Sequence, residues 1–270
     1  MVMRTRGTVR VDVREKGSGP TVVLLPGSLA GLSRWEGLVE ELADDHHVLT
    51  VALHGHGATP PWSAPRRQSL TDQVRLVHAV TAGRDDPVSL IGHGIGGAVA
   101  MRAAVELGER AEALVLVEPV PFSLLARAGR HDVFDDVCRL RDRVVEAADA
   151  QRCAAAAPSV TDHWFGEGTW AGLSERRRAQ FVDAIGPGRH EWDAITDPGL
   201  TLAEVASGSA TTLLLVEPMP QPPIRDLVDV LAQARPDWTV REQLGAGSLA
   251  EPVSIAVLDS VVLEFLRAAR

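Results

Sequence analysis

The stretch Ser89–Gly97 reads SLIGHGIGG and contains the transition that decides the fold. Its first residues form a short apolar run, which is typical of a strand buried on both faces. Four glycines then follow within residues 92–97 and predict a tight turn with Gly94 at its middle. An alanine-rich helical pattern comes next. A strand, a tight turn and a helix in this order indicate one unit of a parallel α/β sheet.

The same alternation of strands and helices extends over most of the chain. Because strands that alternate with helices pair in parallel, we predict a doubly wound, mostly parallel α/β sheet with helices on both faces. Apolar runs bounded by turn residues predict strands at 8–15, 21–27, 46–53, 87–92, 112–119, 211–218 and 237–243. Apolar residues at helical spacing predict helices at 35–42, 70–80, 95–107, 224–234 and 253–266.

The alternation stops between residues 120 and 210, where no buried-strand pattern occurs. This segment is helical in tendency and then loop-rich at 186–199, and it holds seven of the chain's eleven Trp and Phe residues. We therefore expect a core formed by 1–119 and 211–270, and a helical cap or lid formed by 120–210. The aromatic side chains of the cap either line a ligand pocket or form the small core of the cap itself.

The composition excludes several classes of protein. A net charge of −9 over 270 residues, without a basic stripe, argues against a nucleic-acid binder. No apolar run approaches the ~18 residues of a membrane span, and the first residues lack the apolar region of a signal peptide. The two cysteines, Cys138 and Cys153, match neither a metal site nor a disulfide framework. We therefore expect a cytoplasmic protein.

Taken together, the motifs resemble the cap-bearing members of the α/β-hydrolase fold superfamily along essentially the whole chain. Residues 22–59 resemble the family's oxyanion loop, first helix, next strand and G-H-G turn. Residues 90–104 resemble the strand, nucleophile elbow and helix in everything except the nucleophile. The resemblance implies an α/β-hydrolase-type sheet with a helical cap inserted after the sixth strand.

The three catalytic positions of the family are all replaced in this sequence. The serine of the G-x-S-x-G pattern falls at Gly94, the acid at Pro220 and the histidine at Ser248. Glycine supplies no nucleophile, and a serine side chain cannot act as a base near neutral pH. We therefore do not expect a standard serine hydrolase.

Backbone amides at the elbow are the first candidates for a functional site. In the family's geometry the N–H of Ile95 and the N–H of Ser28 or Leu29 form an oxyanion hole that polarises a carbonyl group. The open position at Gly94 would let that carbonyl lie lower in the pocket. The alternative is that these amides only cap the helix that follows the turn.

Polar side chains near the ends of the predicted strands are the next candidates. Glu118 is a candidate general acid or base if burial raises its pKa. His93 is the second catalytic candidate, whereas His56 in the G-H-G turn is expected to be structural. No metal or cofactor motif occurs, so we expect neither. The candidates for substrate binding in the cap and at the former histidine position are His163, Trp164, Trp170, Trp192 and Ser248.

Three classes of function remain open. The main expectation is a cofactor-free, non-hydrolytic cyclase, isomerase or lyase that acts on a bulky apolar carbonyl compound, by analogy with secondary metabolism in bacteria. The second is an inactive pseudo-hydrolase that binds a small molecule or a partner protein. The third is a hydrolase with non-family catalytic residues, such as water activated by His93 or Glu118. In each enzyme reading the partner is a small apolar molecule beneath the cap, not a nucleic acid or a membrane.

Overall fold

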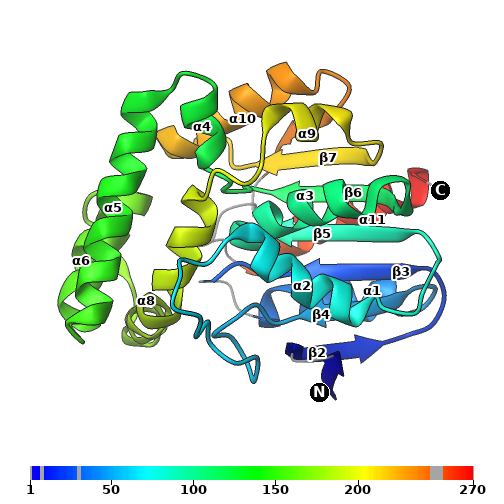
Figure 1. Ribbon diagram of the computed structural model, residues 1–270, viewed down its shortest axis with the longest axis horizontal. Coiled ribbons are helices and arrows are strands. Elements are labelled where there is room, and N and C mark those ends of the chain that lie inside the picture. The colour runs from blue at the N-terminus through cyan, green and yellow to red at the C-terminus, as the bar shows by residue number, and fades with distance from the viewer. Residues whose placement is uncertain (1, 7–8, 29–31, 244–251, 270) are drawn as a thin grey trace.

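A single mixed sheet forms the centre of the protein, as the computed structural model of residues 2–6, 9–28, 32–243 and 252–269 shows (Figure 1). The strand order is β1-β2-β4-β3-β5-β6-β7-β8, in which the pairs β1–β2 and β2–β4 are antiparallel and the remaining pairs are parallel. The predicted fold class is therefore confirmed. The strands are β1 (Val2–Arg6), β2 (Val9–Lys16), β3 (Thr21–Leu25), β4 (His47–Val51), β5 (Val88–His93), β6 (Ala111–Val117), β7 (Thr211–Val216) and β8 (Thr239–Glu242).

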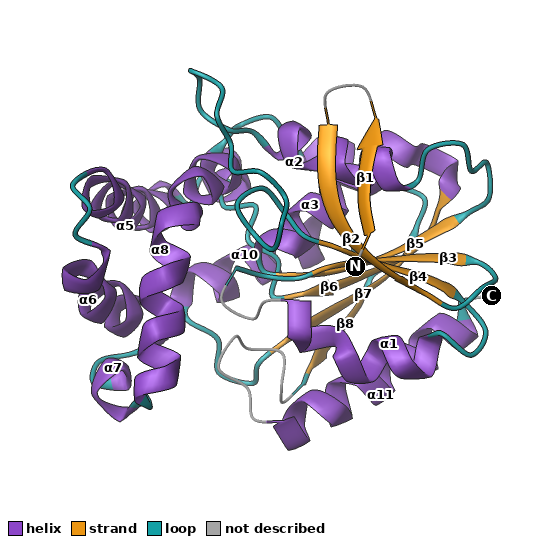
Figure 2. Ribbon diagram, turned by 90° about the horizontal axis from the view of Figure 1, so that it is seen from below, coloured by secondary structure: helices purple, strands orange, loops and turns teal. Residues whose placement is uncertain are grey.

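Helices cover both faces of the sheet, with α2 and α3 on one face and α1 and α11 on the other (Figure 2). None of the helices within the described part of the chain combines the length and the apolar character that a membrane crossing requires. The helices are α1 (Glu36–Leu42), α2 (Leu70–Val80), α3 (Ile95–Leu107), α4 (Ser123–Arg127), α5 (His131–Asp149), α6 (Cys153–Phe165), α7 (Thr169–Gly172), α8 (Glu175–Thr196), α9 (Leu202–Ser207), α10 (Pro222–Ala234) and α11 (Pro252–Ala268).

Strand β3 shows why the sheet needs cover on both sides. All five of its residues are buried, because successive side chains point to opposite faces. Val23 and Leu25 join the core beneath α2 and α3, whereas Val22 and Leu24 join the core beneath α1 and α11. The continuous apolar run in the sequence is thus a strand shared by two cores.

The sheet contains one strand that the sequence analysis did not predict. This strand is β1, and it makes the strand that ends at Val117 the sixth in chain order.

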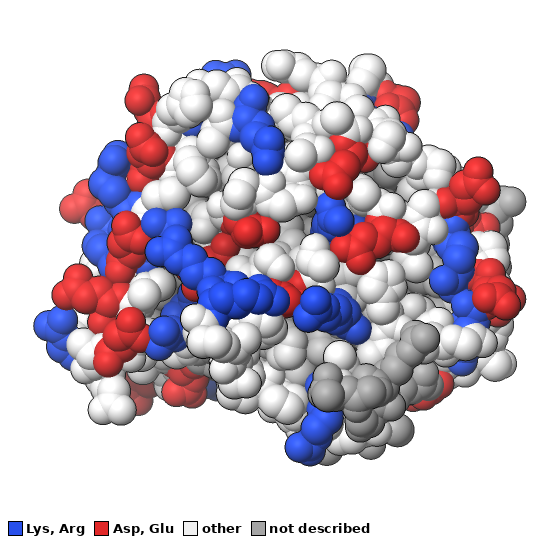
Figure 3. All heavy atoms as spheres, in the orientation of Figure 1, with Lys and Arg blue, Asp and Glu red and all other residues white. Residues whose placement is uncertain are grey.

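Arginine and carboxylate side chains are interspersed over one broad face of the molecule (Figure 3). Arg66 pairs with the buried Asp72 and Arg102 pairs with Glu204, with N–O distances of 2.6 and 2.9 Å. The arginines of these pairs are therefore matched by carboxylates rather than forming a basic stripe.

The cap is formed by helices between β6 and β7, which are neighbours in the sheet. The prediction of a loop-rich segment at 186–199 was wrong, because α8 continues to Thr196. Phe181, Ile185 and Ile195 are buried and lie along one side of this helix, which packs against α5 and α6. The apolar side that these residues form, at spacings of four and ten residues, and the packing they make outweigh the low helix propensity of glycine and proline.

The turn between β5 and α3 is held against β3 by a close backbone approach. A Cβ atom at Gly96 would lie 1.9 Å from the carbonyl oxygen of Leu25, and one at Gly97 would lie 3.0 Å from Pro119. No real side chain fits at the first of these distances. The glycines after Gly94 are therefore required for α3 to begin directly above the end of β3.

Replacement of Gly96 by alanine should consequently destabilise the whole fold. We expect Gly96→Ala to lower the free energy of unfolding by about 3 kcal/mol or more, because the added methyl group forces α3 away from β3. Gly186→Ala is the matched control, since a Cβ at Gly186 meets no atom within 4 Å. That control should gain about 0.5–1 kcal/mol in a helix interior. Urea denaturation measures both, and equal stabilities of the two variants would contradict the packing described.

Candidate active site

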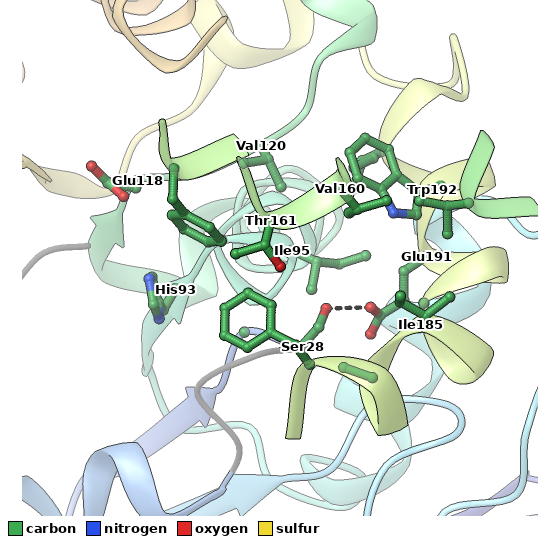
Figure 4. Close-up of a pocket in the computed structure, with 18 of the residues that line it drawn as sticks. Ser28, His93, Ile95, Glu118, Val120, Val160, Thr161, Ile185, Glu191 and Trp192 are labelled. Carbon is green, nitrogen blue, oxygen red and sulfur yellow. Dashed lines mark hydrogen bonds between the residues drawn. The ribbon is translucent and has the colours of Figure 1, made fainter. Parts of the chain in front are cut away.

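A cavity of about 130 Å³ lies where β3, β5 and β6 end, beneath the cap (Figure 4). Gly27 and Ser28 follow β3, Gly94 follows β5 and Glu118 follows β6. The carboxyl ends of parallel strands meet at one edge of a sheet, and ligands of open α/β folds bind there. The cap closes the cavity with mainly apolar side chains, which include Val144, Val160, Phe165, Phe181, Ile185 and Ile195.

Gly94 forms a sharp turn at the floor of the cavity. Its φ of 56° and ψ of −120° lie outside the usual regions for residues with a side chain. Its N–H donates to the carbonyl of Val117 at 2.9 Å, and its own carbonyl accepts from the N–H of Val120 at 3.3 Å. Among the described residues, a Cβ at Gly94 would meet the Cα atom of Gly27, at 3.9 Å, and no other atom within 4 Å. The turn is therefore fixed against the end of β6, with open space above it.

Helix α3 begins at Ile95, directly after this turn, and Ile95 lines the cavity. The first N–H groups of a helix have no partner inside it, and they form the positive end of the helix dipole. The start of α3 can therefore stabilise negative charge that develops on an oxygen in the cavity.

Glu118 lies beside the Gly94 turn and carries a carboxyl group with an unusual proton affinity. It is 7% exposed, lines the cavity and has a φ of 41°, rare for a residue other than glycine. Burial raises the pKa of Glu118 to about 7; the N–H of Glu217, donating to Oε1 at 3.2 Å, opposes this rise, and the Glu217 carboxylate adds to it. Glu118 therefore exchanges a proton readily near neutral pH.

His93 also lines the cavity, but its environment makes it a weak base. Its imidazole is almost completely buried, and a Cβ at Gly27 would lie 3.4 Å from its Nδ1. Burial and the nearby charge of Arg34 lower the pKa of His93 to about 3. The ring is therefore neutral at neutral pH and packs under the loop that carries Ser28.

A second polar group, which the sequence reasoning missed, lies on the cap side of the cavity. Glu191 of α8 is 4% exposed and accepts hydrogen bonds from the Ser28 hydroxyl at Oε2 and from His56 Nε2 at Oε1, the latter at 2.7 Å. Burial disfavours a charged His56, but the charge and hydrogen bond of Glu191 outweigh this effect and raise the pKa of His56. Ser28, Glu191 and His56 form the Ser28–Glu191–His56 cluster, and Figure 4 shows its Ser28–Glu191 hydrogen bond on the other side of the cavity from Glu118.

The sequence itself explains why Glu191 was not predicted as a site residue. Glu191 lies in the segment that the glycines and proline at 186–188 made look like a loop. The apolar spacing that runs from Phe181 through Trp192 to Ile195 was the signal for a helix, and it would have placed Glu191 close to the cavity. His56 is bound within a turn, as expected, but its partner comes from the cap.

The other candidates divide into three groups. Trp192 lines the cavity together with Ser28, His93, Gly94, Ile95 and Glu118. Trp170 packs in the small core of the cap with the guanidinium of Arg178 over its ring, and it is not among the described residues that line the cavity. The expectation that His163 faces the cavity was wrong: it is exposed, because two residues of helix separate it from the buried Thr161 by about 200°. Leu29, Ser248 and the side chain of Trp164 lie outside the described residues.

Part of the chain is similar in sequence to characterised bacterial enzymes. It is 32% identical over 111 residues to the pimeloyl-(acyl-carrier protein) methyl ester esterase of Nitrosomonas europaea, covering 41% of this chain and 42% of that protein. It is 27% identical over 148 residues to the esterase YbfF of Escherichia coli, covering 54% and 55%. The matches thus span about half or less of the length of these relatives.

The likeness to solved structures extends over the whole chain. An esterase from Exiguobacterium antarcticum has a TM-score of 0.77 to this protein, with 98% of each chain covered and 16% of residues identical. At this identity the comparison establishes the common fold.

The expectation of a non-hydrolytic cyclase, isomerase or lyase was wrong, and so was that of an inactive pseudo-hydrolase. Several relatives that match in sequence are named as esterases or hydrolases. The expectation rested on the replacement of the three triad positions at Gly94, Pro220 and Ser248, and the names of these relatives overturn it. The cavity still joins a helix start with a carboxyl group of near-neutral pKa, and both groups suit hydrolysis.

The family comparison covers most of the chain. Residues 22–256 match the alpha/beta hydrolase family, from β3 to the start of α11. This range includes every strand that contributes to the cavity. The chain therefore belongs to the alpha/beta hydrolase family.

Proposed function

We propose that the protein hydrolyses carboxylic esters with a short apolar acyl chain, and that water rather than a serine is the nucleophile. The observation that carries this proposal is the position of Glu118, whose pKa is near 7, beside an elbow residue without a side chain. The choice of water rests on the sequence-based interpretation that Gly94, Pro220 and Ser248 occupy the family's triad positions. The cytoplasmic location remains a prediction from the two cysteines.

The substrate would lie across the Gly94 turn. Its carbonyl oxygen would accept hydrogen bonds from the backbone N–H of Ile95 and from that of Ser28, which we choose over Leu29 as the second donor of the family's oxyanion hole. The acyl chain would extend among the apolar side chains of the cap. A cavity of about 130 Å³ favours short chains over long ones.

Glu118 would act as the general base. As a water oxygen attacks the carbonyl carbon, one water proton passes to the Glu118 carboxylate, and the negative charge collects on the carbonyl oxygen. Collapse of the tetrahedral intermediate then breaks the ester C–O bond, and the same proton passes to the departing alkoxide oxygen. Such proton transfer contributes about 10²–10⁴-fold to a rate. His93 is the poorer base, because its pKa is about 3.

A panel of p-nitrophenyl esters from acetate to laurate tests the activity. We expect saturable, protein-dependent hydrolysis that declines for the longest acyl chains. Pre-incubation with a fluorophosphonate, which modifies nucleophilic serines, should leave the rate unchanged. No hydrolysis across the panel beyond that of the buffer would refute the proposed function.

Removal of the Glu118 carboxylate tests the base directly. We expect Glu118→Gln to lower kcat by about 10²-fold or more with little change in KM, because the amide keeps the shape but takes up no proton. The unionised carboxyl is inactive, so wild-type kcat/KM should rise between pH 5.5 and 8.5 with a midpoint near 7. The variant should lack this midpoint. Glu112→Gln, at the other end of β6, is the control and should retain the wild-type profile.

The open space above Gly94 should also be necessary for hydrolysis. We expect Gly94→Ala to lower kcat by about tenfold or more, because the methyl group occupies the position of the attacking water. Gly83→Ala is the matched control, since Gly83 also has a positive φ, of 76°, and a Cβ there meets no atom within 4 Å. Both variants should lose about 1–2 kcal/mol of stability from backbone strain. Equal activity of the two variants would show that the space is not used.

A further inference from the structure

The Ser28–Glu191–His56 cluster joins three segments that are far apart in the sequence. Ser28 lies in the loop after β3, His56 lies in the loop after β4, and Glu191 belongs to cap helix α8. The hydrogen bonds of Glu191 span 163 residues to Ser28 and 135 residues to His56. One side chain of the cap thus contacts two loops of the core at the edge of the cavity.

Because the Glu191 side chain is buried, docking of the cap requires these hydrogen bonds. A buried carboxylate is costly unless hydrogen bonds and an opposite charge compensate for its lost hydration. Glu191 is 4% exposed, and the raised pKa of His56 favours the imidazolium ion as its partner. Within the described part of the chain, Glu191 is the charged group that raises the pKa of His56. The cap therefore docks at this point only when both bonds form.

The same bonds constrain the loop that carries a carbonyl-binding amide. Ser28 directly follows Gly27, which packs against the backbone of His93, where a Cβ at Gly27 would lie 3.1 Å from the carbonyl oxygen. The hydroxyl of Ser28 is fixed on its other side by Glu191. Donors to an oxyanion must lie about 2.7–3.1 Å from the oxygen, so a small shift of this loop removes a hydrogen bond.

We propose that Glu191 is a positioning residue that holds the Ser28 amide in place for catalysis, so that the site is complete only when α8 is docked. The inference rests on the proposed ester hydrolysis and adds a requirement to it. Glu191 itself does not touch the reacting atoms. It acts through Ser28, and its hydrogen bond with His56 orients its carboxylate.

Variants at Glu191 separate positioning from a general loss of structure. We expect Glu191→Ala to lower kcat by about 10–100-fold, close to the effect of losing one oxyanion donor, and to change KM by less than about threefold. Glu191→Gln should recover most of kcat, because its amide oxygen accepts from Ser28 and its NH₂ group donates to neutral His56. Asp183→Ala removes an exposed carboxylate from the same helix and should match the wild type.

A double-mutant cycle tests whether Glu191 acts through Ser28. Ser28→Ala should lower kcat by a factor similar to that of Glu191→Ala, and the double variant should be no worse than either single variant. Additive losses would overturn the inference, because they would show independent roles. Abolished turnover in Ser28→Ala, together with covalent labelling of Ser28 by a fluorophosphonate, would also overturn it and make Ser28 the nucleophile.

Hydrogen exchange of α8 supplies a readout that does not depend on activity. Glu191→Ala should accelerate exchange of the amides in Glu175–Thr196, whereas Asp183→Ala should not. If the wild type hydrolyses esters but Glu191→Ala leaves both kcat and exchange unchanged, this inference fails and the proposed function stands. If the wild type hydrolyses no ester, the proposed function fails and the catalytic role of Glu191 fails with it. The exchange rates then still decide whether Glu191 holds the cap.

Discussion

The close approach of the β5–α3 turn to the end of β3 is the constraint on which the rest of the structure depends. The carbonyl of Leu25 occupies the space where any side chain at Gly96 would lie. This contact sets the start of α3 at the same sheet edge as Ser28 and Glu118. Amide donors, an acid–base group and an open position at Gly94 therefore converge in one cavity. Loss of the contact would change the positions of these groups relative to one another, although each group would remain chemically the same.

The carboxyl groups on the two sides of the cavity have different electrostatic surroundings. On one side, burial raises the pKa of Glu118 and lowers that of His93, so the carboxyl group is the better proton acceptor of the two. On the other side, Glu191 has an imidazole partner whose pKa is raised. A carboxyl group without a cationic partner suits proton transfer, whereas a paired carboxylate suits structural support. In the proposed mechanism, glutamate thus acts as a base at position 118 and as a structural support at position 191, because the surroundings of the two side chains differ.

The sequence predicted most of the fold and part of the site, for reasons that follow from particular residues. Helix 70–80 was predicted correctly because the spacing of its apolar residues agrees with their burial. Helix 95–107 was predicted correctly because an alanine-rich run follows the glycine turn at Gly94. Glu118 was chosen as a candidate because it directly follows a predicted buried strand, and it lines the cavity. Glu191 was missed because glycine and proline propensity was weighed above the apolar period of α8. Its contacts with Ser28 and His56 are long-range and leave no local signal. The shift of the pKa of Glu118 likewise depends on burial by distant segments.

The central claim is that water attacks the substrate directly, without a covalent intermediate on the protein. A single turnover with excess protein in water enriched in oxygen-18, followed by mass spectrometry of the product acid and of the intact protein, tests it most directly. The account predicts one heavy oxygen in the acid and an unchanged protein mass at every time point. An acyl adduct on the protein, or an unlabelled acid with the heavy oxygen retained in a carboxyl side chain, would contradict it.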